Sequence, residues 1–279
     1  MQYNYSVIIP YRDKYDLFLK AVDSVPDRND IQIIIVDNAP EPLGQRDVPV
    51  KKNATVCYIT SAPARGAGGA RNEGLKRVEG RFLLFLDADD YFTTEAFNAF
   101  DKYISSDYDI VFFRPTSVYL SNGALSSRHE IYSSVVDDYN VNQNENRLRY
   151  RWEVPWSKLY KTKYIIDGSF IFDETRVSND VWFSLMTGHN ANKIAVDNTI
   201  VYVVTEGACG ASLTMKRTKE NWFIRFQVMV RVNRFLKNVG KYKYRIRLAG
   251  ALRIALQEFG FKEFFHLLKY AYSERIGVL

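Results

Sequence analysis

The sequence predicts an α/β protein built on a mostly parallel sheet that is covered by helices. Three runs of β-branched and other apolar residues, at 5–10, 31–36 and 82–86, have the length and composition of buried strands. Between the first two, residues 13–24 place apolar side chains at helical spacing, which completes a βαβ unit. Polar residues follow each run directly, and in open parallel sheets ligands bind at the carboxyl ends of the strands.

The composition is that of a globular protein in a reducing environment. The 279 residues are 47% hydrophobic and 25% charged, which excludes a disordered chain and fits one large domain with an appendage. Cys57 and Cys209 lie outside any metal-binding spacing. The first residues lack the pattern of a secretory signal, and no apolar run approaches the ~18 residues of a membrane span. We therefore expect a cytoplasmic protein.

The chain continues with further predicted elements and one long polar segment. In order, the elements are a strand at 55–60, a helix at about 67–78, a helix at about 94–104, a strand at 109–113, an ordered segment at 153–166, a helix at 179–187 and a strand at 194–204. The polar segment, 121–149, is rich in Ser, Asn, Asp and Arg. We expect it to be a surface excursion that is mobile or contacts substrate.

The net charge of +6 is unevenly distributed along the chain. Residues 1–216 carry 24 Lys and Arg against 28 Asp and Glu, whereas 217–279 carry 14 against 4. From 219 onward, apolar residues at helical spacing predict consecutive basic amphipathic helices. Such helices can lie on the inner face of an anionic cell membrane, cover the rest of the chain, or pair with a second subunit in a homodimer. No nucleic-acid motif accompanies the charge, so we expect no nucleic-acid partner.

The clearest local signal is the acidic pair Asp87 and Asp89 at the end of the 82–86 run. Side chains two residues apart on an extended strand share a face, and like charges held together repel unless a cation joins them. Mn²⁺ or Mg²⁺ fits such oxygens and often takes only one or two carboxylates while substrate phosphates complete its shell. The alternative is a helix N-cap before a helix near Thr93, which is the favoured interpretation for Asp90.

The glycine-rich stretch 65–74 (RGAGGARNEG) matches neither of two well-known nucleotide-binding motifs. Arg71 stands where the third glycine of a Rossmann fingerprint belongs, and no Gly-Lys-Ser/Thr of a Walker A motif follows. Its glycines suit either a phosphate at a helix N-terminus or close packing of a helix on a strand, and both interpretations stay open. For Arg71, contact with phosphate or nucleotide is favoured.

Together, the fragments SVIIPYR, IIIVDN, GAGGARNEG and FLLFLDADD, in this order and spacing, resemble the family 2 glycosyltransferases. The resemblance is close over residues 4–115 and looser to about 213. It implies a GT-A fold and a metal-dependent transfer of a sugar with inversion at the anomeric carbon. The donor would be a nucleotide-sugar, here a UDP-sugar, and the acceptor a glycan or a lipid-linked molecule of surface-polysaccharide synthesis. The domains would be a glycosyltransferase domain at 1–216, with a nucleotide-binding half at 1–115 and an acceptor half at 116–216, and a helical extension at 217–279.

The resemblance also implies a role for each matching residue on the donor side. The donor-binding residues would be Pro10, Tyr11, Arg12, Asp37, Arg71, Asp87 and Ala88. Asp37 would hydrogen-bond the base, and Asp87 would contact the ribose or a metal-bound water. Asp89 would ligate the metal. The family pattern usually has a second aspartate where this chain has Asn38, which weakens any assignment for that residue.

On the acceptor side, Asp180 takes the place of the family's catalytic base, within the segment VSNDVWFSLMTG. We expect the dipole of the following helix to keep this carboxylate ionised, as proton abstraction requires. The alternative is that Asn179, which replaces the usual glutamate, caps the helix and Asp180 serves only the dipole. Trp156 is either part of an acceptor wall or a core residue, and His189 is more simply a surface residue.

Two other functions stay open. A nucleotidyltransferase that makes sugar nucleotides also has a glycine-rich turn and metal-binding carboxylates, but that turn normally follows the first strand, which here runs into 10–12. A catalytically silent protein that binds sugar nucleotides could share the fold. The presence of Asp87, Asp89 and Asp180 argues against it. Analysis of the reaction products separates the three.

Overall fold

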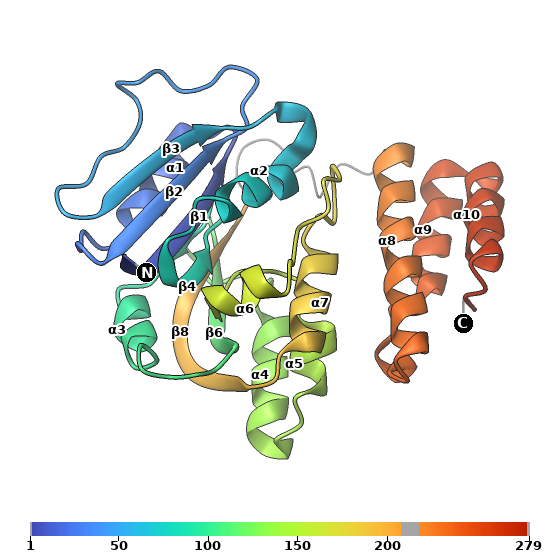
Figure 1. Cartoon of the computed structure of the whole chain (residues 1–279). Helices are drawn as coiled ribbons and strands as arrows, with labels where there is room; N and C mark the ends of the chain where they lie inside the picture. The colour runs from blue at the N-terminus through green and yellow to red at the C-terminus, as the bar shows by residue number, and fades with distance from the viewer. Residues whose placement is uncertain (1, 208–217, 278–279) are drawn as a thin grey trace.

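The computed structural model describes residues 2–207 and 218–277 and has an α/β architecture (Figure 1). Within these residues one eight-stranded sheet runs in the order β3-β2-β1-β4-β7-β6-β8-β5. The strands are β1 (Tyr3–Tyr11), β2 (Ile31–Asp37), β3 (Thr55–Thr60), β4 (Gly80–Phe85), β5 (Tyr91–Phe92), β6 (Ile110–Tyr119), β7 (Lys158–Lys161) and β8 (Ile194–Glu206). The helices are α1 (Tyr15–Asp23), α2 (Gly66–Leu75), α3 (Ala96–Asp101), α4 (Glu130–Asn142), α5 (Asn146–Arg151), α6 (Thr162–Asp167), α7 (Val181–Asn190), α8 (Lys219–Asn238), α9 (Leu248–Phe259) and α10 (Phe261–Ser273), with 3₁₀ turns η1 (Pro63–Arg65) and η2 (Tyr242–Tyr244).

The predicted parallel arrangement is confirmed for the first four strands of this sheet. In β1, Val7 is in register with Ile33 of β2 on one side and with Leu84 of β4 on the other, and both pairings are parallel. Strand β3 continues the parallel order beside β2. Strand β7 then enters antiparallel between β4 and β6, and β5 is antiparallel to β8. The carboxyl ends of β1, β2 and β4 therefore meet at one edge.

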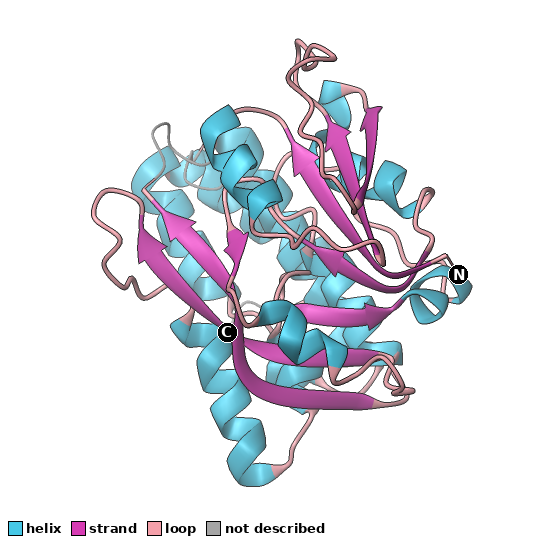
Figure 2. Cartoon of the chain, turned by 90° about the vertical axis from the view of Figure 1, so that its left-hand side faces the viewer, coloured by secondary structure: helices cyan, strands magenta, loops and turns pink. Residues whose placement is uncertain are grey.

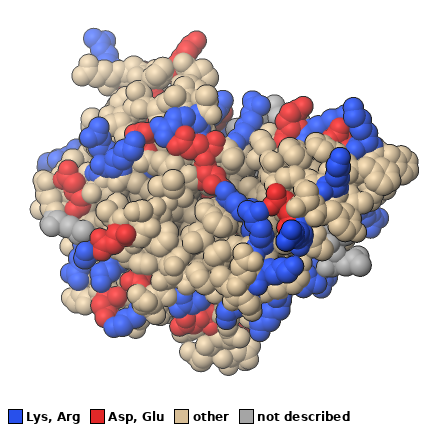
Figure 3. All heavy atoms as spheres, turned by 45° about the vertical axis from the view of Figure 1, so that its right-hand side comes forward, with Lys and Arg blue, Asp and Glu red and all other residues tan. Residues whose placement is uncertain are grey.

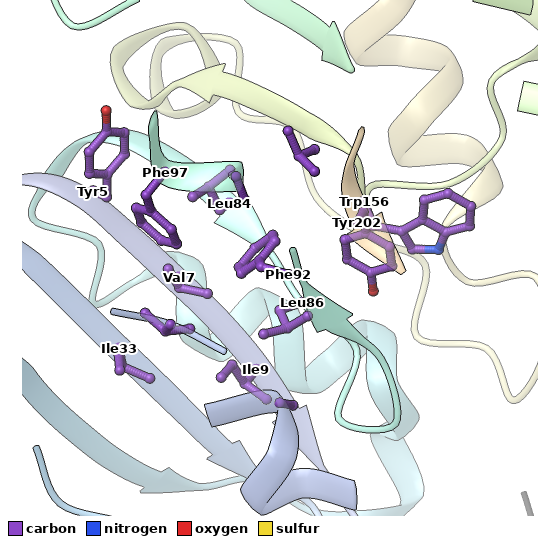
Figure 4. Close-up of a cluster of buried hydrophobic side chains, with 14 of the residues drawn as sticks. Tyr5, Val7, Ile9, Ile33, Leu84, Leu86, Phe92, Phe97, Trp156 and Tyr202 are labelled. Atoms are coloured by element: carbon purple, nitrogen blue, oxygen red, sulfur yellow. The ribbon is translucent and has the colours of Figure 1, made fainter. Parts of the chain in front are cut away.

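The sheet separates two hydrophobic clusters, and helices pack on each (Figure 2). Side chains alternate along β1, so Val7 and Ile9 face the cluster that contains Phe18 of α1, while Ile8 faces the cluster beneath α2. Figure 4 shows the first cluster, in which aromatic rings from separate elements meet. Continuous apolar strands are what a sheet covered on both faces requires, which explains the unbroken apolar runs in the sequence.

The last three helices form a cluster of their own beside the sheet domain (Figure 1). Trp222 and Phe226 of α8 pack with Leu252 of α9 and Leu267 of α10. Another side of α8 contacts residues of α5 and α7 in a smaller apolar cluster. Arg231 of α8 forms an ion pair with Asp173 in the loop before α7. The predicted amphipathic helices are confirmed, and α8 packs against the sheet domain while α9 and α10 pack with α8.

One expectation about the fold is wrong. The segment 121–149 is not a simple surface excursion, because it contains α4 and most of α5. Val135, Val136 and Leu148 are buried against the sheet, and these three apolar side chains hold two otherwise polar helices in place. Such sparse apolar residues give no clear helical period in a window of polar ones. The strand predicted at 109–113 also runs on to Tyr119.

None of the helices among the described residues is both long enough and apolar enough to cross a membrane.

Candidate active site

A pocket of about 640 Å³ opens where β1, β2 and β4 end, and its walls come from both halves of the sheet domain. Asp87 follows β4, and Asp180 lies just before α7, yet both line this pocket. A smaller hollow of about 200 Å³ adjoins it and is lined by Asp87, Ala88 and Asp89. Pro10, Arg12 and Arg71 contribute to both. Acidic side chains from segments far apart in the sequence therefore gather around one space.

Arg71 of α2 connects the two sides of the pocket. Its side chain is buried, its Nη2 donates to Asp87 Oδ1 over 2.5 Å, and its Nη1 donates to Asn179 Oδ1 over 3.0 Å. Charge-assisted hydrogen bonds of this kind fix both partners firmly. Asn179 thus serves Arg71 and does not cap α7. The guanidinium of Arg71 lines the pocket and at the same time binds these two protein groups. The contact with nucleotide that the sequence favours for Arg71 stays a prediction.

The glycines before Arg71 permit close packing of α2 on the loop before α7. A Cβ atom added to Gly68 would lie 1.9 Å from the carbonyl oxygen of Asp173 and 3.0 Å from the Cβ of Asn179. That backbone contact allows no side chain, so packing accounts for Gly68. Gly66, at φ +60°, begins the helix and lines the pocket together with Ala67. The alternative interpretation, contact with phosphate, stays a prediction for these two residues.

Asp89 lies beside a cation that the sequence did not single out. Lys14 Nζ is 3.5 Å from Asp89 Oδ2, and its backbone is left-handed at φ 61° just before α1. Burial raises the pKa of Asp89, the Asp87 charge raises it further, and Lys14 opposes both. The described residues contain no group of three or more metal-ligating side chains. Asp87 and Asp89 line one small hollow, and carboxylate oxygens suit a divalent ion whose shell donor phosphates complete.

Asp180 occupies the N-cap position of α7, and its side chain makes no capping hydrogen bond. It is partly buried, and burial raises its pKa, with Arg71 as the strongest opposing charge. Removal from water thus outweighs the opposing charges in setting the direction of this pKa, and the ionised state expected from the helix dipole stays a prediction. A carboxylate with a raised pKa binds a proton more readily, which suits a general base acting on a hydroxyl.

Asp37 is placed differently from what the resemblance implies. It is fully buried, and its carboxylate accepts hydrogen bonds from Ala39 N, Leu43 N and the Tyr58 hydroxyl, each within 2.8 Å. These bonds hold the loop after β2. Asn38, the next residue, lines the pocket instead, and its Nδ2 has no hydrogen-bond partner among the described residues. Asn38, which stands where the family pattern usually has a second aspartate, is thus the residue that reaches the pocket.

Alternation along β1 decides which of the three residues at its end face the pocket. Pro10 and Arg12 line it. Tyr11 points to the other side, where its ring packs on Phe18 with centroids 4.5 Å apart. Tyr11 therefore does not line this pocket, because neighbouring strand residues face opposite sides, and the apolar wall that the resemblance assigns to it stays a prediction.

Asp90 and Trp156 both belong to the support of the site. Asp90 is not a helix cap, because α3 begins only at Ala96. Its buried carboxylate accepts hydrogen bonds from the Tyr202 hydroxyl and from Thr205 N. Trp156 stacks on Tyr202 with ring planes 9° apart (Figure 4), is almost fully buried, and still lines the pocket. It is a core residue, and its acceptor role stays a prediction.

His189 lies in the last turn of α7, away from the residues that line the pocket. Its Nδ1 is 3.1 Å from the Tyr150 hydroxyl, and its ring packs edge-on against Phe235 of α8. Burial lowers its pKa. It is therefore a packing residue between helices rather than a residue of a polar surface loop.

Three basic residues near the site were not recognised as site residues from the sequence. Arg128 and Arg176 line the pocket and are exposed. Lys158 of β7 is buried among aromatic rings, and burial lowers its pKa strongly. The arginines belong to no motif, so no sequence signal marks them, and only the folded chain brings them together.

Comparison with known proteins agrees with this geometry. The family described as Glycosyl transferase family 2 matches residues 6–173. An uncharacterized glycosyltransferase of Bacillus subtilis, EpsJ, is 25% identical over 213 residues, which are 72% of this chain and 60% of EpsJ. The poly(ribitol-phosphate) β-N-acetylglucosaminyltransferase TarS of Staphylococcus aureus is 23% identical over 69% of this chain and 34% of TarS. The chain thus spans between about a third and three fifths of the length of these relatives.

Solved structures show the same fold. The crystal structure of S. aureus TarS 1–349 in complex with UDP-GlcNAc has a TM-score of 0.68 and 19% identity, over 97% of this chain and 81% of that one. A mannosyltransferase from Pyrobaculum calidifontis in complex with GDP-Man and Mn²⁺ has a TM-score of 0.57 and 14% identity, over 98% and 80%. The protein has the GT-A fold, and from its sequence match over more than half its length it belongs to glycosyl transferase family 2.

Proposed function

We propose that this protein transfers a sugar from a nucleoside diphosphate sugar to an acceptor hydroxyl with inversion at the anomeric carbon. The observation that carries the proposal is the meeting of Asp87 and Asp180 in one pocket beside Asp89. A volume of about 640 Å³ is within the usual range for small-molecule sites. A UDP-sugar donor is supported by the TarS structure, whose title names UDP-GlcNAc.

The residues of the pocket divide into a donor side and an acceptor side. Arg12 and the unpaired amide of Asn38 lie at the strand ends, where the nucleotide and its diphosphate would bind. Asp89, with Asp87, would hold Mn²⁺ or Mg²⁺, which when bound supplies positive charge to the departing diphosphate. The relative from P. calidifontis is named with Mn²⁺. Asp180 faces the same space from the acceptor side.

The reaction follows as a single displacement. Asp180 accepts the proton of the acceptor hydroxyl, and the oxygen forms a bond to the anomeric carbon. The bond from that carbon to the diphosphate oxygen breaks, and the nucleoside diphosphate leaves with the bonding electrons on the opposite face. Arg71 holds Asp87 on the donor side and Asn179 next to the base, so it keeps the two sides at a fixed separation.

Product analysis tests this proposal against its two rivals. The purified protein is incubated with a panel of sugar nucleotides, Mn²⁺ or Mg²⁺, and candidate acceptors. Free nucleoside diphosphate together with a glycosylated acceptor supports transfer. Pyrophosphate released from a nucleoside triphosphate and a sugar phosphate would instead identify a nucleotidyltransferase. Binding of sugar nucleotides without any product would identify a silent binding protein.

The names of relatives suggest the class of acceptor. TarS is named for poly(ribitol-phosphate), and the Escherichia coli enzyme WfaP, 28% identical over 49% of this chain and 57% of its own length, is named for a sugar-diphosphoundecaprenol. We propose a glycan or lipid-linked acceptor of surface-polysaccharide synthesis for this protein. We also propose that the protein works at the inner face of the cell membrane, because the helical extension offers a surface that suits an anionic bilayer.

That surface is one side of α10. Phe261, Phe265 and Tyr272 are 71%, 60% and 66% exposed, and their spacing of four and seven residues places them along one stripe of the helix. Lys262 and Lys269 flank the stripe and are also exposed. Figure 3, in which the side of the last helices comes forward, shows many Lys and Arg side chains on that side of the molecule. Aromatic residues beside cations are typical of helices that lie on anionic bilayers.

Vesicle binding tests the stripe. Replacing Phe261, Phe265 and Tyr272 by Ser should reduce sedimentation with vesicles of phosphatidylglycerol and phosphatidylcholine, and pure phosphatidylcholine should bind the unaltered protein weakly. The control is Ile131→Ser with Val141→Ser, which removes exposed apolar residues from α4 instead. If the triple variant binds vesicles normally and instead changes the mass of the protein in solution, the stripe is a homodimer contact and not a membrane surface.

A further inference from the structure

After the ion pairs of the pocket are assigned, Arg12, Arg128 and Arg176 have no salt-bridge partner among the described residues, and Arg128 and Arg176 are the two that do not line the hollow beside Asp89. Arg71 is paired with Asp87, and Lys14 with Asp89. Among the described residues, neither Arg128 nor Arg176 makes a hydrogen bond or an ion pair, and Arg176 has only a weak electrostatic interaction with Glu220 of α8. The segments outside the description, 1, 208–217 and 278–279, contain no Asp or Glu that could neutralise them. Both guanidinium groups are therefore available to an anion.

The two arginines lie on the acceptor side. Both line the large pocket together with Asp180 and Trp156, and neither lines the small hollow beside Asp89. The Tyr132 hydroxyl is within electrostatic reach of Asp180 and of Arg128, and the Tyr132 ring packs edge-on against Trp156. By contrast, Arg12 lines both spaces, including the hollow that contains Asp89.

The backbone around each arginine is held in place. Ser117 of β6 accepts from Ser126 N through its carbonyl and from His129 N through its hydroxyl, which anchors the chain on both sides of Arg128. In the loop before α7, Val177 is buried next to Arg176, and Asp173 N donates to Asn179 O across the loop. Guanidinium groups on fixed backbone lose less freedom when they bind, which favours specific recognition.

Given the proposed transfer reaction, on which this inference rests, we propose that the acceptor carries a phosphate near the hydroxyl that receives the sugar. Arg128, just before α4, and Arg176, in the loop before α7, bind that phosphate together. Arginine suits it because its planar group pairs with two phosphate oxygens at once. The phosphate belongs either to a diphosphate-linked lipid or to a phosphodiester polymer, and the chemistry at the two arginines is shared.

The test uses small phosphate probes on the protein saturated with UDP and Mg²⁺, so that the donor site is filled. Octyl diphosphate represents the lipid-linked source, bis(glycero)phosphate represents the polymer, and glycerol is the neutral probe. Binding is measured by titration calorimetry after UDP affinity has been measured for each protein. Arg128→Ala and Arg176→Ala should each weaken phosphate-probe binding about 10-fold or more and change UDP affinity by less than about 2-fold.

The control is Arg253→Ala, which removes an exposed arginine of α9 and should leave both affinities unchanged. Binding of one phosphate probe alone supports the proposal and identifies its source. Failure of both probes to bind the UDP-saturated protein would overturn it while leaving the transfer function intact. A parallel loss of UDP affinity in the two arginine variants would also overturn it, because the arginines would then serve the donor. Failure of UDP to bind the unaltered protein would remove the proposed function itself.

Discussion

Gly68→Ala is the substitution whose effect the structure defines most sharply. The new Cβ atom would lie 1.9 Å from the carbonyl oxygen of Asp173. Ordinary carbon–oxygen contacts begin near 3.3 Å, so Asp173 must retreat by about 1.5 Å. Asp173 N donates to Asn179 O, and Asn179 immediately precedes Asp180. The displacement therefore passes directly to the proposed base.

Two effects of different size follow. Overpacking of this kind costs about 1–3 kcal/mol of unfolding free energy. A shift of about 1 Å at a catalytic group can reduce the rate about 10²-fold. We therefore expect kcat to fall about 10²-fold while UDP affinity, which depends on the strand ends, changes little. Thermal unfolding should move down by about 3–10 °C in a chain of this size.

The matched control is Gly250→Ala in α9, where a Cβ atom meets nothing within 4 Å. An exposed helical glycine replaced by alanine should raise stability by about 0.5–1 kcal/mol and leave activity unchanged. Steady-state kinetics with a sugar nucleotide and calorimetric unfolding measure both variants. Full activity and an unchanged unfolding temperature in the Gly68 variant would refute the argument that this glycine sets the position of Asp180.

Three further predictions concern the carboxylates. Asp180→Asn should keep UDP affinity and lower kcat about 10²–10⁴-fold. In the unaltered protein, kcat should rise with pH through a value above the ordinary aspartate pKa, because Asp180 has a raised pKa and accepts a proton only when it is ionised. A kcat that stays constant from pH 4 upward would contradict this. Asp89→Ala should abolish the gain in UDP affinity that Mn²⁺ gives, and calorimetry showing the same gain in both proteins would exclude Asp89 as a metal ligand. Tyr202→Phe should lower unfolding free energy by about 1–3 kcal/mol, because buried Asp90 loses a donor, and an unchanged urea midpoint would speak against it.

The sequence predicts the parallel part of the sheet well because β1 to β4 each carry their own signal, whereas the short strands β5 and β7 were not predicted as strands. The apolar runs that became β1, β2 and β4 are buried on both faces, so their burial does not depend on where the rest of the chain lies. The polar residues that follow these strands lie at one edge of the sheet because the strands are parallel and end there. This is why Asp87 and Asp89 could be placed at the site from their positions alone.

Side-chain direction and environment were harder to predict because they depend on distant segments. Asp37 is turned inward by the loop that folds back to Leu43 and by Tyr58 on β3. The pKa of Asp180 depends on burial beneath groups from other elements, which no local pattern reveals. The direction of Tyr11 was accessible in principle, since alternation along β1 separates it from its two neighbours.

The ion pair between Arg231 and Asp173 has a practical consequence for any shortened form of this protein. Asp173 is the residue against which Gly68 packs, so helix α8 braces the same loop that presents the base. Cutting the chain after the last strand would remove that brace along with the aromatic stripe, and lost turnover in such a fragment would have two origins. Substitutions confined to the outer side of α10 leave the brace in place and separate attachment from catalysis.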